Sequence, residues 1–187
     1  MTTDLADQRF REIYTANQRP VMAYFLRRTD ASAALDGAAE TFLVAWRRLD
    51  EIPTGERTLP WLYGVSRRVL ANQRRSQERF NALGQKLTQT GEPEDPSPEV
   101  VVLRRAEDEE MLAAVNRLAS QDREILRLAV WEELPHAQIA DVVGTSAHAV
   151  TQRLYRITKQ LARDLKHPAA GGGHGIARQP SEGGGRS

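Results

Sequence analysis

Basic and amide side chains recur at helical spacing in residues 67–79, which contain five arginines and a single acidic residue, Glu78. Four side chains lie at i, i+4, i+7 and i+11 and would form one stripe on a helix: Arg68, Asn72, Arg75 and Arg79. Cations in such a row can follow a phosphate backbone, and Trp61 and Tyr63 at the start of the segment are candidate stacking partners for bases. A solvated basic surface, with both aromatic rings in a core, is the alternative interpretation.

A second set of polar side chains covers one face of the segment that begins near residue 147. Its apolar residues lie at i, i+4, i+7 and i+11: Val150, Leu154, Ile157 and Leu161. The opposite face is polar and basic, with one aromatic ring: His148, Thr151, Gln152, Arg153, Tyr155, Arg156 and Lys159. Donors and cations of this kind suit base edges and phosphates in a major groove. An ordinary helical hairpin is the alternative.

The sequence contains no residue set with the spacing of a catalytic or metal site. The absence of cysteine excludes thiolate chemistry, disulfides and a zinc site built on Cys. The four histidines form no HExxH or other spaced ligand set, and neither a GxSxG motif nor a phosphate-binding loop occurs. We therefore expect no enzyme activity, no cofactor and no metal.

The polar face from residue 147 onward requires a helix-turn-helix to position it. Ala140 is small enough for two helices to approach closely, and Gly144 can supply the positive φ of a sharp turn. Ser146 can cap the following helix, which Val150 and Leu154 would hold against the preceding one.

The basic stripe requires a helix that begins near Pro60, a residue suited to a first helical turn. Residues 52–60 form the loop before it, and Leu62, Val65 and Val69 give the helix an inward face. Two earlier segments, around residues 10–25 and 38–49, also carry apolar residues at helical spacing, with Phe42 and Trp46 as expected core residues and Pro20 as a kink or junction. Together they predict a small helical bundle.

Composition and charge predict an all-α protein made of two small domains. The chain has 187 residues, and seven of its 13 glycines lie at positions 171–185, so its first 170 residues contain few turn formers. Residues 84–110 carry eight acidic and three basic side chains, a net charge of −5, and include three prolines within six residues. We expect an N-terminal helical bundle at 1–83, an acidic flexible linker at 84–100, a C-terminal helix-turn-helix domain at 101–166 and a disordered Gly-rich tail at 167–187.

Three stretches form a pattern that spans both expected domains. They are ETFLVAW at 40–46, PWLYGVSRRVL at 60–70, and DREILRL at 122–128 followed by IADVVG at 139–144. In this order and spacing they resemble the extracytoplasmic-function (ECF) subfamily of bacterial RNA polymerase sigma factors. The resemblance covers about residues 8–165, and it is specific because two motif blocks precede the common helix-turn-helix.

The resemblance implies a role for each polar face. The helix that bears ETFLVAW would dock on the clamp helices of the largest polymerase subunit through Asp36 and Glu40, although LDGAAE at 35–40 departs from the usual family pattern. The loop at 50–60 would capture a base flipped from the −10 element. The matching −10 positions are Trp61, Arg67, Arg68, Asn72, Arg74 and Arg75.

At the −35 element, the resemblance implies base contacts by Thr151, Gln152, Tyr155 and Arg156 and a phosphate contact by Arg153, with His148 on the same face. The implied partners are RNA polymerase core, including the flap of its second-largest subunit, promoter DNA and an anti-sigma factor. The acidic linker would enter the RNA channel as an RNA mimic or act as a solvated tether, and both interpretations stay open.

We expect a cytoplasmic protein that associates with the nucleoid when bound to polymerase, since the sequence shows no secretory signal and no apolar run long enough to span a membrane. Two other functions compete with a sigma factor. The first is a helix-turn-helix regulator that binds duplex DNA without being a polymerase subunit. The second is an adaptor protein with incidental basic surfaces.

Overall fold

The computed structural model describes residues 3–85 and 106–166, and all regular secondary structure within these ranges is helical. This confirms the all-α prediction for the described part of the chain. The α-helices are α1 (Thr3–Leu26), α2 (Ala31–Arg47), α3 (Thr58–Gln85), α4 (Ala106–Arg117), α5 (Ser120–Val130), α6 (His136–Val143) and α7 (Ala147–Lys166). Two short 3₁₀ helices, η1 (Leu49–Glu51) and η2 (Gly55–Arg57), lie between α2 and α3. The expected linker at 84–100 and the tail at 167–187 lie almost entirely outside the described residues.

No described helix has both the length and the apolar character needed to cross a membrane.

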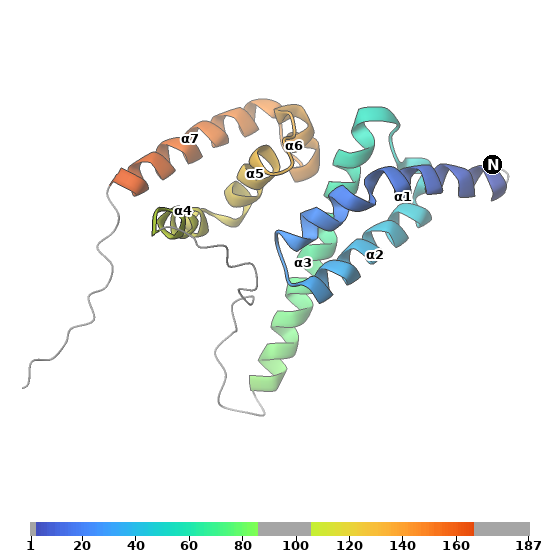
Figure 1. The fold of residues 1–187 in the computed structure, drawn as a ribbon, viewed down its shortest axis with the longest axis horizontal. Coiled ribbons are helices and arrows are strands. Elements are labelled where there is room, and N and C mark those ends of the chain that lie inside the picture. Colours follow the sequence, from blue (N-terminus) through green and yellow to red (C-terminus); the bar gives the residue numbers. More distant parts are fainter. Residues whose placement is uncertain (1–2, 86–105, 167–187) are drawn as a thin grey trace, which may run out of the picture.

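Helices α1, α2 and α3 pack on one another as a bundle (Figure 1). Helix α1 continues through Pro20, so this proline does not mark a junction. Helix α2 begins after Asp30, whose carboxylate accepts a hydrogen bond from the backbone N–H of Ala33 at 2.9 Å. Leu62, Val65 and Val69 of α3 are buried, which confirms the predicted inward face.

Close approach of α1 and α2 depends on Gly37. A Cβ atom at this position would overlap the ring of Phe25, which is itself fully buried. A second contact joins α2 to α3, where the buried hydroxyls of Thr41 and Ser66 lie 3.3 Å apart. Phe42 is buried as expected, but the expectation for Trp46 is wrong. The ring of Trp46 packs edge-on against Phe10 of α1, and this contact leaves it 41% exposed.

Helices α4 to α7 form the second domain, and α6 and α7 make the predicted helix-turn-helix. Gly144 ends α6 with φ of 74°, a left-handed conformation that glycine adopts at little cost. The Ser146 hydroxyl then accepts a hydrogen bond from the backbone N–H of Ala149 at 3.1 Å, as expected of a cap. Val150 and Ile157 are buried, which fixes the face that α7 turns outward.

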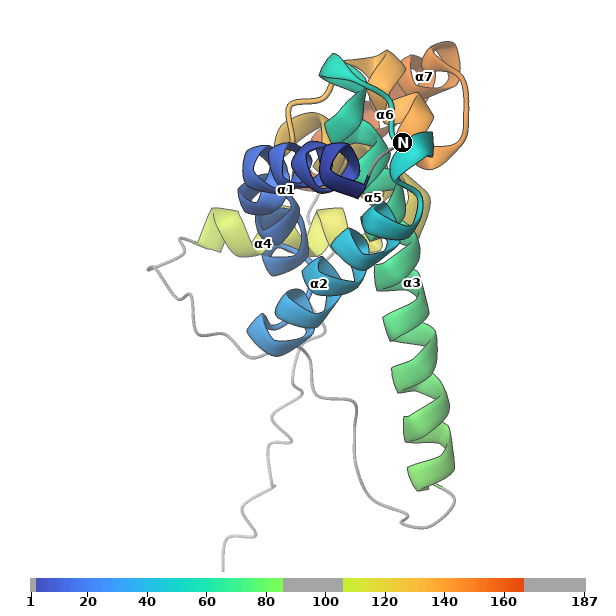
Figure 2. The same cartoon turned by 90° about the vertical axis from the view of Figure 1, so that its right-hand side faces the viewer.

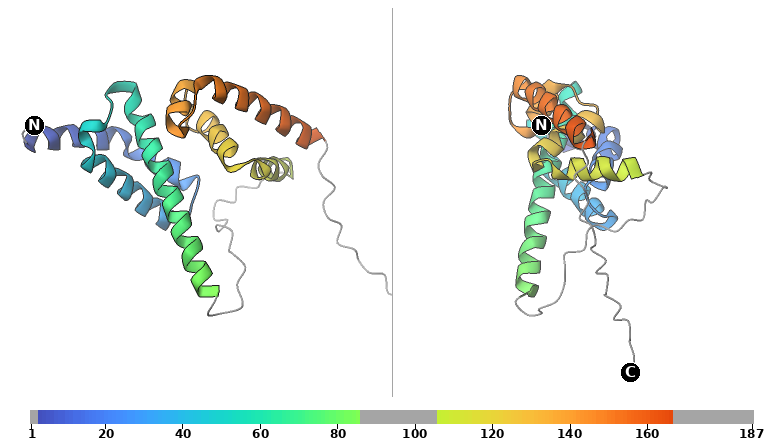
Figure 3. Two further views of the ribbon diagram at one scale, coloured as in Figure 1. Left: turned by 180° about the vertical axis from the view of Figure 1, so that it is seen from behind. Right: turned by 90° about the vertical axis from the view of Figure 1, so that its left-hand side faces the viewer.

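The two domains pack directly against each other. Helix α3 lies against α6, and the buried apolar residues of both domains form one continuous cluster. From the front and from behind, α7 runs away from the N-terminal bundle (Figures 1 and 3). The second half of α3 extends beyond the bundle (Figure 2), and nearly all side chains described from residue 71 onward in this helix are exposed. The sequence predicted two domains but not this contact between them.

Candidate nucleic-acid and polymerase interface

Helix α3 brings the predicted −10 residues together on one element. Arg68, Asn72, Arg74 and Arg75 are exposed, whereas Arg67 is half-buried. The guanidinium of Arg75 donates a hydrogen bond to the side-chain oxygen of Asn72 one turn earlier. The structure therefore presents a basic face along α3, but its members differ in their surroundings.

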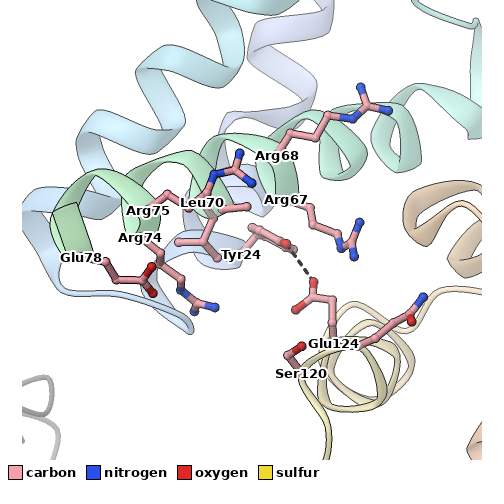
Figure 4. Close-up of a pocket in the computed structure, with 11 residues that line it drawn as sticks. Tyr24, Arg67, Arg68, Leu70, Arg74, Arg75, Glu78, Ser120 and Glu124 are labelled. Atoms are coloured by element: carbon pink, nitrogen blue, oxygen red, sulfur yellow. Dashed lines mark hydrogen bonds between the residues drawn. The ribbon is translucent and has the colours of Figure 1, made fainter.

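The arginines of α3 line a cleft of about 510 Å³ between the two domains. Its walls include Arg67, Arg68, Arg74 and Arg75 from α3, Tyr24 from α1 and Glu124 from α5. In Figure 4, Arg67 and Arg74 point from α3 toward α5, while Arg68 extends in another direction. Half of the predicted −10 arginines thus face the C-terminal domain in this arrangement.

Trp61 and the preceding loop lie at the other end of α3. The Trp61 ring is half-buried, and the guanidinium carbon of Arg48 lies 5.8 Å from its centroid. The loop is held by Arg9, which donates a hydrogen bond to the carbonyl oxygen of Ile52 at 2.7 Å. Tyr63 is buried and stacks on Tyr24 with centroids 5.3 Å apart, so this ring belongs to the core and not to a stacking surface.

The predicted −35 residues all lie on α7, and most are exposed. Tyr155 is 62% exposed, and its ring lies under the ammonium group of Lys159 at 4.7 Å. Arg156 and Gln152 are one turn apart on the same exposed face. This part of the structure offers the hydrogen-bond donors of Gln152 and Arg156, the Tyr155 ring and the Lys159 ammonium group to a DNA groove.

Three other α7 side chains have partners within the domain. The Thr151 hydroxyl lies 2.8 Å from Nδ1 of His136 on α6. His148 Nε2 lies 2.8 Å from the Gln152 amide nitrogen. Arg153 donates to Asp122 at 3.2 Å and is half-buried. These three side chains therefore already have hydrogen-bond partners within the C-terminal domain.

Asp36 and Glu40, the predicted polymerase contacts, are exposed one turn apart on α2. The structure adds an apolar groove beside them, of about 490 Å³, between α1 and α2. Its lining includes Tyr14, Met22, Leu26 and Leu35, and Leu35 is 61% exposed. Sequence periodicity assigned no function to these residues. The sequence signal that could have indicated this groove is an apolar residue, Leu35, next to Asp36 on an exposed helix face.

No sequence pattern indicated the polar network that lies between the domains, formed by Tyr24, Arg27, Arg28, Glu124 and Glu132. Burial, followed by the nearby Glu124 carboxylate, raises the pKa of Tyr24 far above its ordinary range. Burial, followed by the Glu132 carboxylate, does the same to the pKa of Tyr63. Burial alone would lower the pKa of Arg28, but the Glu124 carboxylate, Tyr24 and the hydrogen bonds to Glu124 and Glu132 together outweigh burial, and the pKa is raised. The guanidinium and both phenols thus keep their protons across the neutral range.

Within the described residues, no group of three or more His, Asp or Glu side chains is arranged to hold a metal ion.

Two family models match the chain, one at each domain. The model described as Sigma-70 region 2 matches residues 13–80, and that described as Sigma-70, region 4 matches residues 108–161. The first match covers most of α1, all of α2 and the basic part of α3. The second covers the helix-turn-helix.

Individual proteins give the same result. The ECF RNA polymerase sigma factor SigL of Mycobacterium tuberculosis is 30% identical over 159 residues, which are 83% of this chain and 88% of SigL. The probable RNA polymerase sigma factor RfaY of Xanthomonas campestris is 32% identical over 163 residues, but these residues span only 40% of that protein's length.

Among solved structures, the sigma factor RpoE in complex with the anti-sigma factor NepR from Bartonella quintana superposes with a TM-score of 0.60. The match covers 84% of this chain and 96% of RpoE at 19% sequence identity. This likeness shows a shared fold.

Proposed function

Because this chain belongs to the extracytoplasmic-function family of RNA polymerase sigma factors, we propose that it binds the polymerase core, directs it to promoters through −10 and −35 elements and assists DNA melting. Members of the family are non-catalytic subunits, so the chemistry of polymerisation belongs to the core enzyme. The match to region 2 over residues 13–80 carries this proposal. A regulator that binds only duplex DNA needs a helix-turn-helix, but it does not need a region 2 domain.

Recognition of the −10 element belongs to α3 in this proposal. Arg67, Arg68, Arg74 and Arg75 neutralise phosphates of the separating strands, and Asn72 positions Arg75 through their hydrogen bond. Trp61 lies at the fork where the strands part, and the exposed loop before it takes the flipped base. The support is the position of these residues on one helix, where Arg68, Asn72, Arg74 and Arg75 are exposed.

Recognition of the −35 element belongs to α7. Its N-terminal half enters the major groove, where Gln152 and Arg156 reach base edges, and Thr151 and Tyr155 complete the contact. His148 orients the Gln152 amide, and Arg153 holds a phosphate in exchange for part of its ion pair with Asp122. The support is the arrangement of these side chains on the outward face of the helix-turn-helix.

Docking to the polymerase core belongs to α2 and the adjacent groove. The clamp helices of the largest subunit contact Asp36 and Glu40, and apolar side chains of the clamp enter the groove at Leu35. The C-terminal domain contacts the flap of the second-largest subunit. An anti-sigma factor is the proposed inhibitor, and the proposed location is the cytoplasm, at the nucleoid when polymerase is bound.

The test combines transcription with a binding measurement. Run-off transcription with core enzyme on a promoter library should give discrete starts that core alone does not give. The charge reversal Asp36→Lys/Glu40→Lys should weaken core binding about tenfold. The reason is that the reversal replaces an attraction by a repulsion, which changes the binding free energy on the order of 1 kcal/mol at a surface charge pair.

Reversal of two exposed acids on α1, Asp4→Lys/Glu12→Lys, is the matched control and should leave core affinity unchanged. No stimulation of initiation by the wild-type protein would contradict the proposed function. Equal core affinity for all three proteins would remove only α2 from the docking surface.

A further inference from the structure

The cleft between the two domains gathers arginine side chains of α3. It has a volume of about 510 Å³ and is lined by four guanidinium groups and two carboxylates: Arg67, Arg68, Arg74, Arg75, Glu78 and Glu124. This volume lies within the range of about 300–1,000 Å³ that small-molecule sites occupy. The cleft therefore combines space for a small ligand with an excess of positive charge, which attracts anions.

Two of these arginines, Arg67 and Arg74, point across the cleft toward α5 (Figure 4). Arg67 is half-buried, yet among the described residues its guanidinium has no ion-pair or hydrogen-bond partner. Arg74 is exposed and donates one long hydrogen bond, to the carbonyl oxygen of Arg28 at 3.4 Å. Because a guanidinium carries five N–H donors, most donors on this wall have no acceptor within the described part of the chain.

The carboxylate on the opposite wall is already engaged. Glu124 accepts a hydrogen bond from the Tyr24 hydroxyl at 2.8 Å and pairs with the Arg28 guanidinium at 3.1 Å. Glu78 is exposed and forms no ion pair with another described residue. Four guanidinium groups thus face one carboxylate without such a partner, and the cleft keeps a net positive charge.

Helix α5 adds uncharged hydrogen-bonding groups to the wall that the arginines face. Ser120 and Gln121, its first two residues, line the cleft. Their hydroxyl and amide groups can donate hydrogen bonds to an anion. The cleft therefore differs from a plain basic surface, because a ligand inside it would contact side chains of both domains.

The spacing of Arg67 and Arg74 indicates which anion fits. Seven residues separate them, a rise of about 10 Å along an α-helix. A chain of linked phosphoryl groups matches two guanidinium groups at this spacing better than a single phosphoryl group does, and guanidinium pairs with phosphate oxygens through parallel hydrogen bonds. Tyr24, the aromatic residue of the lining, is 0% exposed, so its ring offers no face on which a base could stack.

We propose that this cleft binds a small anion with two or three linked phosphoryl groups, held by Arg67 and Arg74 of α3 and by Ser120 and Gln121 of α5. A nucleoside triphosphate and inorganic tripolyphosphate share this chemistry. Binding of the anion does not depend on the proposed function. Its consequence rests on that function, since a promoter strand and the anion compete for the same two arginines.

Isothermal titration calorimetry of the full chain with tripolyphosphate, at fixed ionic strength and without polymerase or magnesium, tests the site. We expect saturable binding that is about tenfold or more tighter than that of orthophosphate. Arg67→Gln/Arg74→Gln should weaken binding of tripolyphosphate by about the same factor. Arg57→Gln/Arg79→Gln removes the same charge at exposed positions outside the lining and is the matched control. This control should bind tripolyphosphate as the wild type does.

Ser120→Ala/Gln121→Ala tests the second wall without changing the net charge. It should weaken tripolyphosphate binding severalfold, because two donors to the anion are lost. Its affinity for a short single-stranded oligodeoxynucleotide should stay unchanged, since α5 has no part in the proposed −10 site. Loss of binding in the arginine variant alone would reduce the site to the basic face of α3 and overturn the proposal. Equal affinity of the wild type, the arginine variant and its control would also overturn it, and so would orthophosphate binding as tight as that of tripolyphosphate.

A parallel titration with ATP distinguishes the two sources of linked phosphates. Similar affinities for ATP and tripolyphosphate would assign recognition to the phosphate chain, which is the expected result. ATP binding that is tighter by about tenfold or more would assign the site to nucleotides, with the nucleoside also in contact with the cleft.

Displacement of a labelled single-stranded oligodeoxynucleotide by tripolyphosphate separates this proposal from the proposed function. If the anion binds in the cleft but displaces no strand, the proposed role of Arg67 and Arg74 at the −10 element fails and the anion site stands. If the protein supports initiation with core enzyme but no variant changes anion binding, the anion site fails alone.

Discussion

The exposed face of α7 contains side chains with very different surroundings, although the sequence presents them as one polar set. Arg153 is paired with Asp122 at 3.2 Å, and Thr151 lies 2.8 Å from His136. Within the described ranges, the side chains of Gln152 and Arg156 instead form hydrogen bonds only with the preceding turn of their own helix, to His148 and to the Gln152 carbonyl oxygen. These two side chains are therefore best placed to exchange their contacts for base edges.

We expect Gln152→Ala and Arg156→Ala each to relax the preference at one or two −35 positions and to leave the −10 preference intact. A bidentate amide–adenine or guanidinium–guanine contact discriminates between bases by about 1–3 kcal/mol. Selection from a promoter library with a randomised −35 element measures the preference. Arg163→Ala, further along the same exposed face, is the control and should affect all sequences alike or none. Wild-type preference at every position in Gln152→Ala would exclude its base-reading role.

At the scale of elements, the two halves of α3 have different functions. Its first half is a core element with Leu62, Val65 and Val69 buried, and its second half extends beyond the bundle with exposed side chains. Helix propensity and the buried first half together maintain the exposed second half, because an isolated helix of this length is only marginally stable in water. A rigid, solvent-exposed basic helix is the result.

We expect Arg68→Ala/Arg75→Ala/Arg79→Ala to flatten the salt dependence of open-complex formation. Each lost phosphate contact on a single strand lowers the slope of log K against log salt by about 0.7. The defect should be smaller on a pre-melted template, where strand separation is already supplied. Open-complex formation on both templates at several salt concentrations gives the comparison. Equal defects would mean that these arginines assist binding alone and not melting.

The turn between α6 and α7 gives a prediction about stability. Gly144→Ala should lower the free energy of unfolding by about 1–2 kcal/mol, because a side chain at its φ of 74° clashes with the backbone. Gly64→Ala is the control. Gly64 lies inside α3, and nothing lies within 4 Å of the added Cβ, so this change should stabilise by about 0.5–1 kcal/mol. Urea unfolding of both variants measures these effects, and destabilisation of similar size in both would contradict the argument from φ.

At the scale of the whole molecule, the contact between domains makes stability depend on alkaline pH. Burial raises the pKa values of Tyr24 and Tyr63 above the ordinary value of 10.0. A raised pKa in the folded state means that the stabilisation is fully present below the ordinary pKa and is lost as pH rises above it. The free energy of unfolding should therefore fall above about pH 10.

Tyr24→Phe/Tyr63→Phe should reduce this alkaline loss, and urea unfolding at a series of pH values measures it. Tyr155→Phe, which alters an exposed ring on α7, is the control and should keep the wild-type pH dependence. An equal alkaline loss in all three proteins would show that other groups cause it.

The sequence by itself determined the features that depend on residues close together in the chain. The spacing of Val150, Leu154 and Ile157, together with Gly144 and Ser146, predicts the helix-turn-helix, because helical periodicity and turn conformation are local properties. The inward face of α3 followed in the same way from Leu62, Val65 and Val69. Both polar faces were thereby placed opposite the buried ones.

Only the tertiary structure decided which of these residues meet across the fold. Arg28 and Glu124 are 96 positions apart, and no local pattern marks either of them as a partner of the other. The exposure of Trp46 likewise depends on how α1 crosses α2, and the groove at Leu35 exists only once both helices are packed. Helix periodicity gives the face of a side chain, but long-range packing determines what covers that face. For this reason, the basic stripe of α3 was predictable from the sequence, and the packing of the C-terminal domain against α3 was not.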